Sequence, residues 1–238
     1  MLDNLVKQPE ISQRMLRYGY DPNKIKEGRD LYEEAERLYK KSKKESAEST
    51  QAYAKFTDKL EKVKATYSLD RKKAKAAFAN RKEIYKQLAI EKVESRSYPV
   101  WIAETEQFYQ NLHDDAELFN VIKEMDMTAN HLTEMLRDIS DVKSLYSAYT
   151  KEKGESQDAV KLKDKAFKDL SEWTRACYTV AKIALHDRKQ LLEASQSSLK
   201  ASDRQNKQIS RVVMSKTLLS DKIPFPAKGI FRKTIIKQ

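Results

Sequence analysis

The sequence predicts an all-α protein, an antiparallel helical bundle of two sequence-related units with long helices. Three observations predict this fold class. The 238 residues include only 4 Gly and 5 Pro, and 35% of them are charged, a composition typical of helical chains. No proline, which would remove a helical hydrogen bond, occurs in 23–98 or in 100–223. Apolar residues recur at intervals of three and four, the pattern of one helical face.

A short helix and a turn are predicted before the first long helix. Gly19 stands where a helix would end with a left-handed residue, Asp21 is a candidate N-cap, and Pro22 suits the first helical position. The long helix should run from about residue 22 to 66, with a stripe of small or apolar residues: Leu31, Ala35, Leu38, Ala52, Phe56, Val63 and Tyr67. Ser68 and Asp70 can begin a return helix, KKAKAAFANRKEIYKQL, folded back against it.

The second half of the chain repeats the first in a constant register, in which adding 107 to a position gives its counterpart. Identical pairs in this register include Asn23 with Asn130, Leu38 with Leu145, Tyr39 with Tyr146, Ala52 with Ala159, Ala74 with Ala181 and Arg81 with Arg188. A constant register with apolar positions in phase indicates a duplication. The second copy should turn at Asp126, use Thr128 as a cap, and end in the return helix VAKIALHDRKQLLEAS.

One domain is predicted over residues 1–202, with repeat units at about 15–88 and 122–195 and a connector at 89–121. In the connector, Ser97 to Pro99 break the chain, and a short helix follows that should clip one copy to the other. Its apolar residues are Trp101, Ala103, Phe108, Tyr109 and Leu112. Residues 203–238 are expected to form a basic tail, disordered or bound to a partner, with nine basic and two acidic residues.

Two polar hexamers interrupt the apolar stripes, KESAES at 44–49 and KEKGES at 151–156. Within each, two glutamates lie three positions apart and share a helical face. The four glutamates, Glu45, Glu48, Glu152 and Glu155, could converge if the two copies packed about a twofold axis. Such carboxylates resemble metal sites of four-helix bundles, but those sites also need Glu-x-x-His motifs.

The three histidines, His113, His131 and His186, stand in no such motif, so the sequence predicts no metal and no cofactor. The hexamers then act as devices that fix helix register, or as solvated segments with a bend at Gly154. His186 and Asp187 are adjacent and point about 100° apart on a helix, which argues against a catalytic dyad. No catalytic residue is predicted.

Charge and cysteine content bear on location and partners. The single cysteine, Cys177, fits a reducing compartment and a small buried side chain. No signal peptide and no run of roughly 18 apolar residues is present, so a cytoplasmic location is expected. The net charge of +11 is concentrated in the tail, whose candidate anion-binding residues are Arg204, Lys207, Arg211, Lys228, Arg232 and Lys233.

GYDPNKIKEGRDLY, WIAETEQFYQNL and AKIALHDRKQLLE, together with the Glu-Ser centre of each long helix, resemble an uncharacterised bacterial family of duplicated all-helical bundle proteins. The resemblance covers about residues 10–200 and leaves out the basic tail. It implies the fold and the duplication, and it implies no activity, ligand or site residue.

The leading functional hypothesis is a non-enzymatic helical scaffold or interaction protein that binds a protein partner or a second copy. The alternative is a peripheral anion binder, at a membrane surface or on nucleic acid, acting through the tail. A carboxylate metal site at the hexamers is the third hypothesis.

Overall fold

In the computed structural model, which describes residues 8–188 and residue 190, every element is a helix and no strand occurs. The elements are α2 (Pro9–Leu16), α3 (Pro22–Ala77), α4 (Lys82–Gln87), α5 (Tyr98–Asp114), α6 (Ala116–Ile122), the 3-10 turn η1 (Lys123–Met125) and α7 (Ala129–Ala184). The all-α class is therefore confirmed for this part of the chain. Within it, no helix is both long and apolar enough to cross a membrane.

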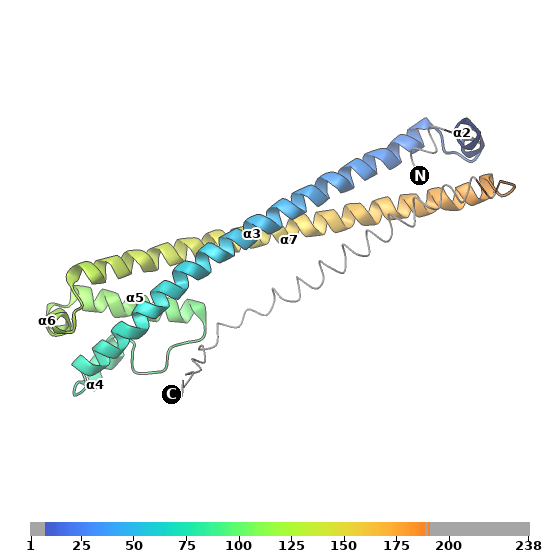
Figure 1. Cartoon of the computed structure of the whole chain (residues 1–238). Helices are drawn as coiled ribbons and strands as arrows, with labels where there is room; N and C mark the ends of the chain where they lie inside the picture. The colour runs from blue at the N-terminus through green and yellow to red at the C-terminus, as the bar shows by residue number, and fades with distance from the viewer. Residues whose placement is uncertain (1–7, 189, 191–238) are drawn as a thin grey trace, which may run out of the picture. The chain divides into compact units, whose positions relative to one another are not determined.

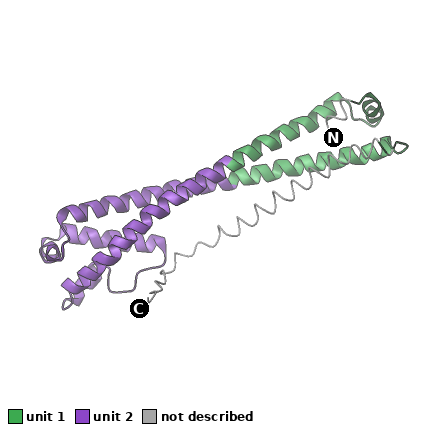
Figure 2. Cartoon of the chain, viewed as in Figure 1, with its two compact units in different colours: residues 1–43, 158–238 green, residues 44–157 purple. Residues whose placement is uncertain are grey.

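Helices α3 and α7 dominate the fold, at 56 residues or about 84 Å each (Figure 1). The sequence register that relates the two copies pairs Pro22 with Ala129 and Ala77 with Ala184, so the two helices begin and end at equivalent positions. The chain divides into two compact units, residues 1–43 with 158–238 and residues 44–157, here called unit 1 and unit 2 (Figure 2). Each unit contains part of α3 and part of α7.

The predicted starts of the long helices are confirmed. Gly19 has φ +84°, and the Asp21 carboxylate accepts a hydrogen bond from the Lys24 backbone N–H at 2.7 Å. Before α7, Asp126 is left-handed with φ 59°, and the Thr128 hydroxyl accepts from the His131 N–H at 3.2 Å. Two different sets of residues thus make the same helix-turn-helix entry.

The predicted return helices are wrong, because both long helices continue straight through their expected turns. Helix α3 runs past Ser68 and Asp70 to Ala77, and only the six-residue α4 follows it. Asp70 does not cap a helix, because it is buried among side chains and the buried stripe continues through Ala74 to Phe78. Helix α7 likewise continues to Ala184, five residues into the second predicted return helix at 180–195. Residues 189 and 191–195 of that predicted helix lie outside the described residues.

Unit 1 has a core in which the Trp173 ring packs on the backbone of Gly28. The core cluster contains Ile11, Met15, Tyr20, Ile25, Trp173, Cys177, Ala181, Ala184 and Leu185. Tyr20 meets the Trp173 ring edge-on, with centroids 6.0 Å apart. A second, smaller group joins Ala35, Leu38 and Ala166.

The core of unit 2 is aromatic and is built on α5. Tyr67 of α3 packs edge-on against Trp101 and Phe108 of α5, at 5.9 and 5.3 Å between centroids. Four of the five apolar connector residues predicted to pack are buried, whereas Ala103 is exposed. Helix α5 also reaches α7, since Lys143 donates to Glu106 at 2.5 and 2.6 Å. Helix α5, which lies in the predicted connector, therefore contacts both long helices within unit 2.

Two glycines in the long helices should respond oppositely to alanine. A Cβ on Gly28 would lie 2.4 Å from two Trp173 ring atoms, whereas a Cβ on Gly154 would meet nothing within 4 Å. We expect Gly154→Ala to raise the free energy of unfolding by roughly 0.5–1 kcal/mol, because alanine costs less entropy in a helix.

The same helix-propensity gain applies at Gly28, but there the overlap with the Trp173 ring costs more. Gly28→Ala is expected to lower the free energy of unfolding by about 1–2 kcal/mol net. Urea denaturation of both variants measures the difference. Equal stabilisation by the two substitutions would contradict the packing of Trp173 against Gly28.

Candidate functional site

The polar hexamers lie inside continuous helix, KESAES in α3 and KEKGES in α7. Both hexamers belong to unit 2, and their side chains meet: carboxylate oxygens of Glu45, Glu48 and Glu152 all lie within 4.8 Å of one another. The three residues are half-buried. The Ser46 and Ser156 hydroxyls, from the same two hexamers, are 3.4 Å apart.

The fourth glutamate does not join this cluster. Glu155 is exposed, and its carboxylate lies 3.8 Å from the Lys151 ammonium. Glu48 has the equivalent lysine, Lys44, at 3.6 Å. The predicted convergence therefore involves three of the four glutamates. Gly154 lies inside α7, with the helix continuous on both sides of it.

Three carboxylates offer the oxygen ligands that Mg²⁺ and Ca²⁺ prefer, but these ions take six or more ligands. The group contains no histidine, and His131 is bonded elsewhere in unit 2. Converging half-buried carboxylates also repel one another, and among the described residues Lys44 is the one lysine ion-paired with them. We therefore interpret Glu45, Glu48 and Glu152 as a cluster of like charges and assign no metal to it.

Removing one charge from the cluster should stabilise the protein. We expect Glu152→Gln to raise the free energy of unfolding by about 0.5–1 kcal/mol at low salt, because repulsion between the carboxylates is relieved and glutamine keeps the helix propensity. The gain should vanish in molar NaCl, which screens the remaining charges.

Glu155→Gln is the matched control, because this residue is outside the cluster and should give no gain. Thermal melting at two salt concentrations measures both variants. A loss of stability in Glu152→Gln alone would indicate that the three carboxylates act together as ligands.

A second polar constellation, which the sequence did not predict, surrounds a buried carboxylate in unit 2. Asp70 of α3 is only 1% exposed. The Tyr109 hydroxyl of α5 donates to Asp70 Oδ2 at 2.8 Å, and His131 Nε2 of α7 lies 2.6 Å from the same oxygen. The Lys73 ammonium is 3.9 Å from Oδ1. One carboxylate thus connects three helices.

The partners of Asp70 differ in exposure and in chemistry. Tyr109 is completely buried, and burial together with the Asp70 charge raises the pKa of its hydroxyl, so it remains a hydrogen-bond donor. The His131 side chain is 28% exposed. A carboxylate on one ring nitrogen fixes the orientation of the imidazole, as in the acid–base pairs of enzymes. The geometry here also satisfies a carboxylate that would be costly to bury alone.

The sequence contained one signal for this network. Asp70 falls between Tyr67 and Ala74 on the buried stripe of α3, where a charged residue needs partners. Capping residue types at positions 68 and 70 favoured a helix start instead. The packing of α5 and α7 decides which donors reach Asp70. Local sequence patterns do not predict that packing.

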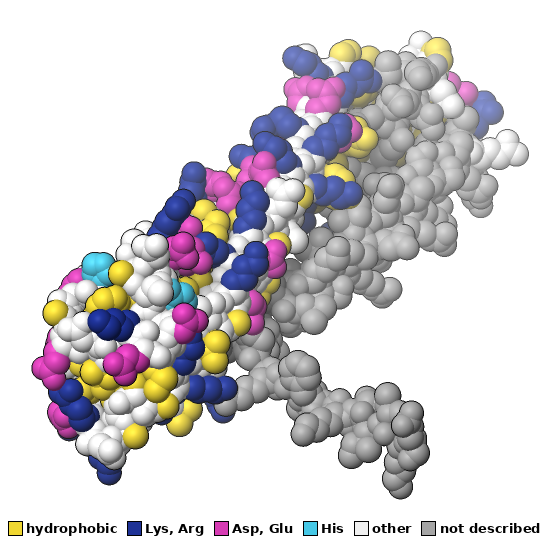
Figure 3. Space-filling model, turned by 60° about the vertical axis from the view of Figure 1, so that its left-hand side comes forward, with side chains coloured by type: hydrophobic (Ala, Val, Ile, Leu, Met, Phe, Trp, Pro, Cys, Tyr) yellow, Lys and Arg dark blue, Asp and Glu magenta, His cyan; other side chains and the backbone are white. Residues whose placement is uncertain are grey.

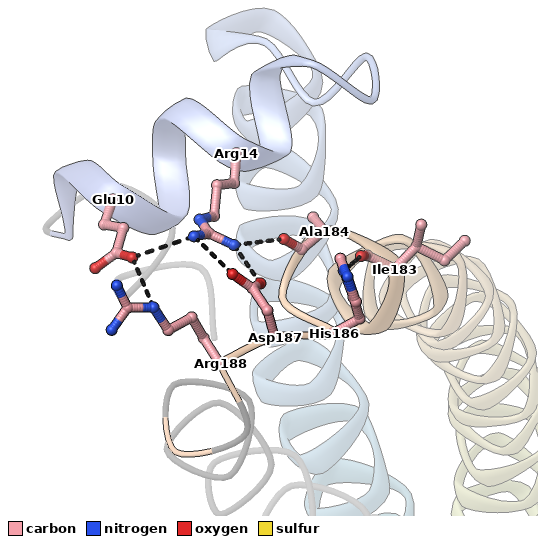
Figure 4. A network of polar contacts seen from close by, with 7 residues as sticks. All are labelled: Glu10, Arg14, Ile183, Ala184, His186, Asp187 and Arg188. Carbon is pink, nitrogen blue, oxygen red and sulfur yellow. Dashed lines mark hydrogen bonds and ion pairs between the residues drawn. The ribbon is translucent and has the colours of Figure 1, made fainter.

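Another polar network joins α2 to the end of α7 in unit 1 (Figure 4). The Arg14 guanidinium binds both oxygens of Asp187, at 2.5 and 3.1 Å, and donates to the Ala184 carbonyl at 3.4 Å. Glu10 lies between Arg14 and Arg188, at 3.6 and 3.5 Å. Hydrogen bonding to Arg14 lowers the pKa of the Asp187 carboxyl.

This network leaves His186 and Asp187 without a mutual contact. The His186 ring nitrogen faces the Ile183 carbonyl at 3.2 Å, while Asp187 is bound to Arg14. The two adjacent side chains therefore make separate contacts. Cys177 is buried as predicted, and burial raises the pKa of its thiol to about 12, which disfavours the reactive thiolate.

The predicted anion-binding residues of the tail, Arg204, Lys207, Arg211, Lys228, Arg232 and Lys233, lie outside the described residues. Comparisons with known protein families, characterised proteins and solved structures found no match to this chain.

Proposed function

We propose that this protein is a non-enzymatic helical scaffold that binds a protein partner through the exposed sides of α3 and α7. The proposal includes a duplicated, antiparallel bundle in a reducing, cytoplasmic setting. The observation that supports it most is the presence of half-exposed large side chains along both helices. In unit 1 these are Tyr32, Leu162 and Ile183, which are 52%, 49% and 51% exposed. Tyrosine is among the residue types enriched in protein–protein contact surfaces.

Duplication and antiparallel pairing are supported by three further facts. The ends of α3 and α7 fall at equivalent positions of the two copies. In unit 2, positions late in α3 contact positions early in α7, as in Asp70 with His131 and Lys59 with Asp138. In unit 1, the early Gly28 meets the late Trp173. Within each unit, such contacts are those expected of antiparallel helices.

The polar networks also support a structural role. Asp70, Arg14 and Lys59 each use their charged groups to tie one helix to another. Elsewhere, basic and acidic side chains are interspersed over the face seen in Figure 3, as on an ordinary solvated surface.

Site-specific photo-crosslinking in cells tests the proposal. A photoreactive phenylalanine at Tyr32 should capture one discrete partner, or a second copy of the chain. The same group at Glu33, which is exposed on α3 but points about 100° away, is the matched control and should capture much less. Light scattering of the purified chain identifies a second copy by mass. Equal weak labelling at both positions, with a monomeric chain, would refute the proposal.

A further inference from the structure

One stretch of the described chain is as basic as the tail. Residues 62–86 contain nine basic and two acidic residues, a net charge of +7. One of the two acidic residues, Asp70, is buried and already bonded to Tyr109 and His131. The surface formed by this stretch is therefore more basic than its composition indicates.

The matching stretch of the second copy shows that the helix does not require this charge. Residues 169–193, the counterparts in the register of the duplication, contain four basic and four acidic residues and have no net charge. Lys62 and Lys72 correspond there to Asp169 and Thr179, and both copies form the same 56-residue helix. The excess of lysine in the first copy thus has another cause than helix formation.

The solvent side of α3 in this stretch carries lysines and small or aliphatic residues. We call this side the lysine face; it consists of Lys62, Ala65, Leu69, Lys72 and Ala76. These positions recur at intervals of three and four, all of them are exposed, and Leu69 is 55% exposed. On the opposite side, Val63, Tyr67 and Phe78 are buried in unit 2.

The ammonium groups of this face have no ionic partner among residues 8–188, whereas several neighbouring cations do. Arg71 donates to the Ile90 and Lys92 carbonyls and lies 3.8 Å from Glu94. Lys73 lies 3.9 Å from Asp70. The ammonium groups of Lys62 and Lys72 take part in no described ion pair or hydrogen bond, and neither do those of Lys82 and Lys86 on α4.

From this arrangement we infer that the lysine face of α3 binds the surface of an anionic lipid membrane. Unpaired lysines gain Coulomb energy at a negatively charged leaflet. Leu69, Ala65 and Ala76 gain by leaving water at the boundary between headgroups and acyl chains. The inference does not depend on the proposed protein partner, for which the residues named above, Tyr32, Leu162 and Ile183, lie in unit 1.

Nucleic acid would use the lysines but not the aliphatic side chains. Phosphate contacts come from basic and polar groups, and non-specific single-strand binding adds aromatic rings for base stacking. The lysine face has no aromatic residue, and its centre is Leu69. An anionic membrane surface can use both groups of side chains, because its headgroups attract the lysines and its acyl chains take up the aliphatic residues.

Vesicle flotation of the full chain tests the inference, with phosphatidylcholine vesicles that contain or lack phosphatidylserine. The chain should float only with the anionic vesicles. Lys62→Gln/Lys72→Gln should lower the partition coefficient about 25-fold, roughly fivefold for each lysine. Leu69→Gln should lower it several-fold without any change of charge.

Lys41→Gln/Lys165→Gln is the matched control, because it removes two exposed lysines from unit 1 and leaves the lysine face intact. It should weaken flotation much less than the lysine-face pair. Far-ultraviolet circular dichroism checks that every variant keeps its helix content.

Three results would overturn the inference. The parent chain fails to float with anionic vesicles, or the control pair weakens flotation as much as the lysine-face pair. In the third, Lys62→Gln/Lys72→Gln binds duplex DNA more weakly than the parent chain in an anisotropy assay, and Leu69→Gln floats as the parent chain does. That combination would assign the lysine face to nucleic acid. Partner capture at Tyr32 is a separate readout, so the proposed scaffold function can fail or hold independently.

Discussion

Asp70→Ala is expected to lower the free energy of unfolding by about 3–5 kcal/mol, because it breaks a buried charge network from its centre. The Tyr109 hydroxyl, which is completely buried, loses its acceptor, and an unsatisfied buried donor alone costs roughly 1–3 kcal/mol. His131 loses a contact of 2.6 Å that joins α7 to α3. The variant also leaves a cavity between α3 and α5.

Urea denaturation followed by circular dichroism measures the effect, with Asp58→Ala as the matched control. Asp58 is an exposed aspartate on the same helix and should change stability by less than about 0.5 kcal/mol. Tyr109→Phe should cost about 1.5–3 kcal/mol, since it removes one hydrogen bond to a buried carboxylate.

The double variant Asp70→Ala/Tyr109→Phe should lose less than the sum of the single losses, because both changes break the same bond. A loss below roughly 1 kcal/mol for Asp70→Ala would mean that the network contributes little to stability. The alternative role for Asp70 would then be to orient the imidazole of His131.

Local signals in the sequence predicted local structure well. Gly19, Asp21, Asp126 and Thr128 each take the backbone or capping role expected of them, because helix ends are decided by a few adjacent residues. The all-α class followed from composition and periodicity, which average over many residues. The register of the duplication anticipated the equivalent bounds of α3 and α7.

The errors came from residues whose role depends on distant parts of the chain. Asp70 is a capping residue type, but its carboxylate is bonded by α5 and α7, so α3 does not end there. Spacing placed Glu45 and Glu48 on one face of α3, but it could not decide which glutamate of α7 faces them. That choice depends on how α7 is rotated about its axis, which the packing of apolar residues along the whole helix determines.

Trp173→Ala is expected to lower the free energy of unfolding by about 3–5 kcal/mol, the usual loss for a buried tryptophan. Trp173 is 7% exposed, packs on the backbone of Gly28, and meets Tyr20 edge-on in the core of unit 1. Its position in the first copy is Thr66, so the long helix itself does not need an aromatic residue there. The loss should therefore reflect tertiary packing alone.

Trp173→Phe separates packing from hydrogen bonding. The indole Nε1 is buried without a partner in the described structure, so phenylalanine removes an unsatisfied donor as well as some volume. We expect these effects to offset each other in part, and the loss to stay below about 2 kcal/mol.

A double-mutant cycle with Gly28 then tests the contact directly. The smaller ring should make room for a Cβ at position 28, so Gly28→Ala should cost less in the Trp173→Phe background than in the parent chain. Strict additivity, measured by urea denaturation of the four proteins, would show that the tryptophan ring does not rest on Gly28. Coupling of roughly 1 kcal/mol or more would fix the pairing of α3 with α7 in unit 1, because Gly28 and Trp173 can interact only if these two helices pack there as described.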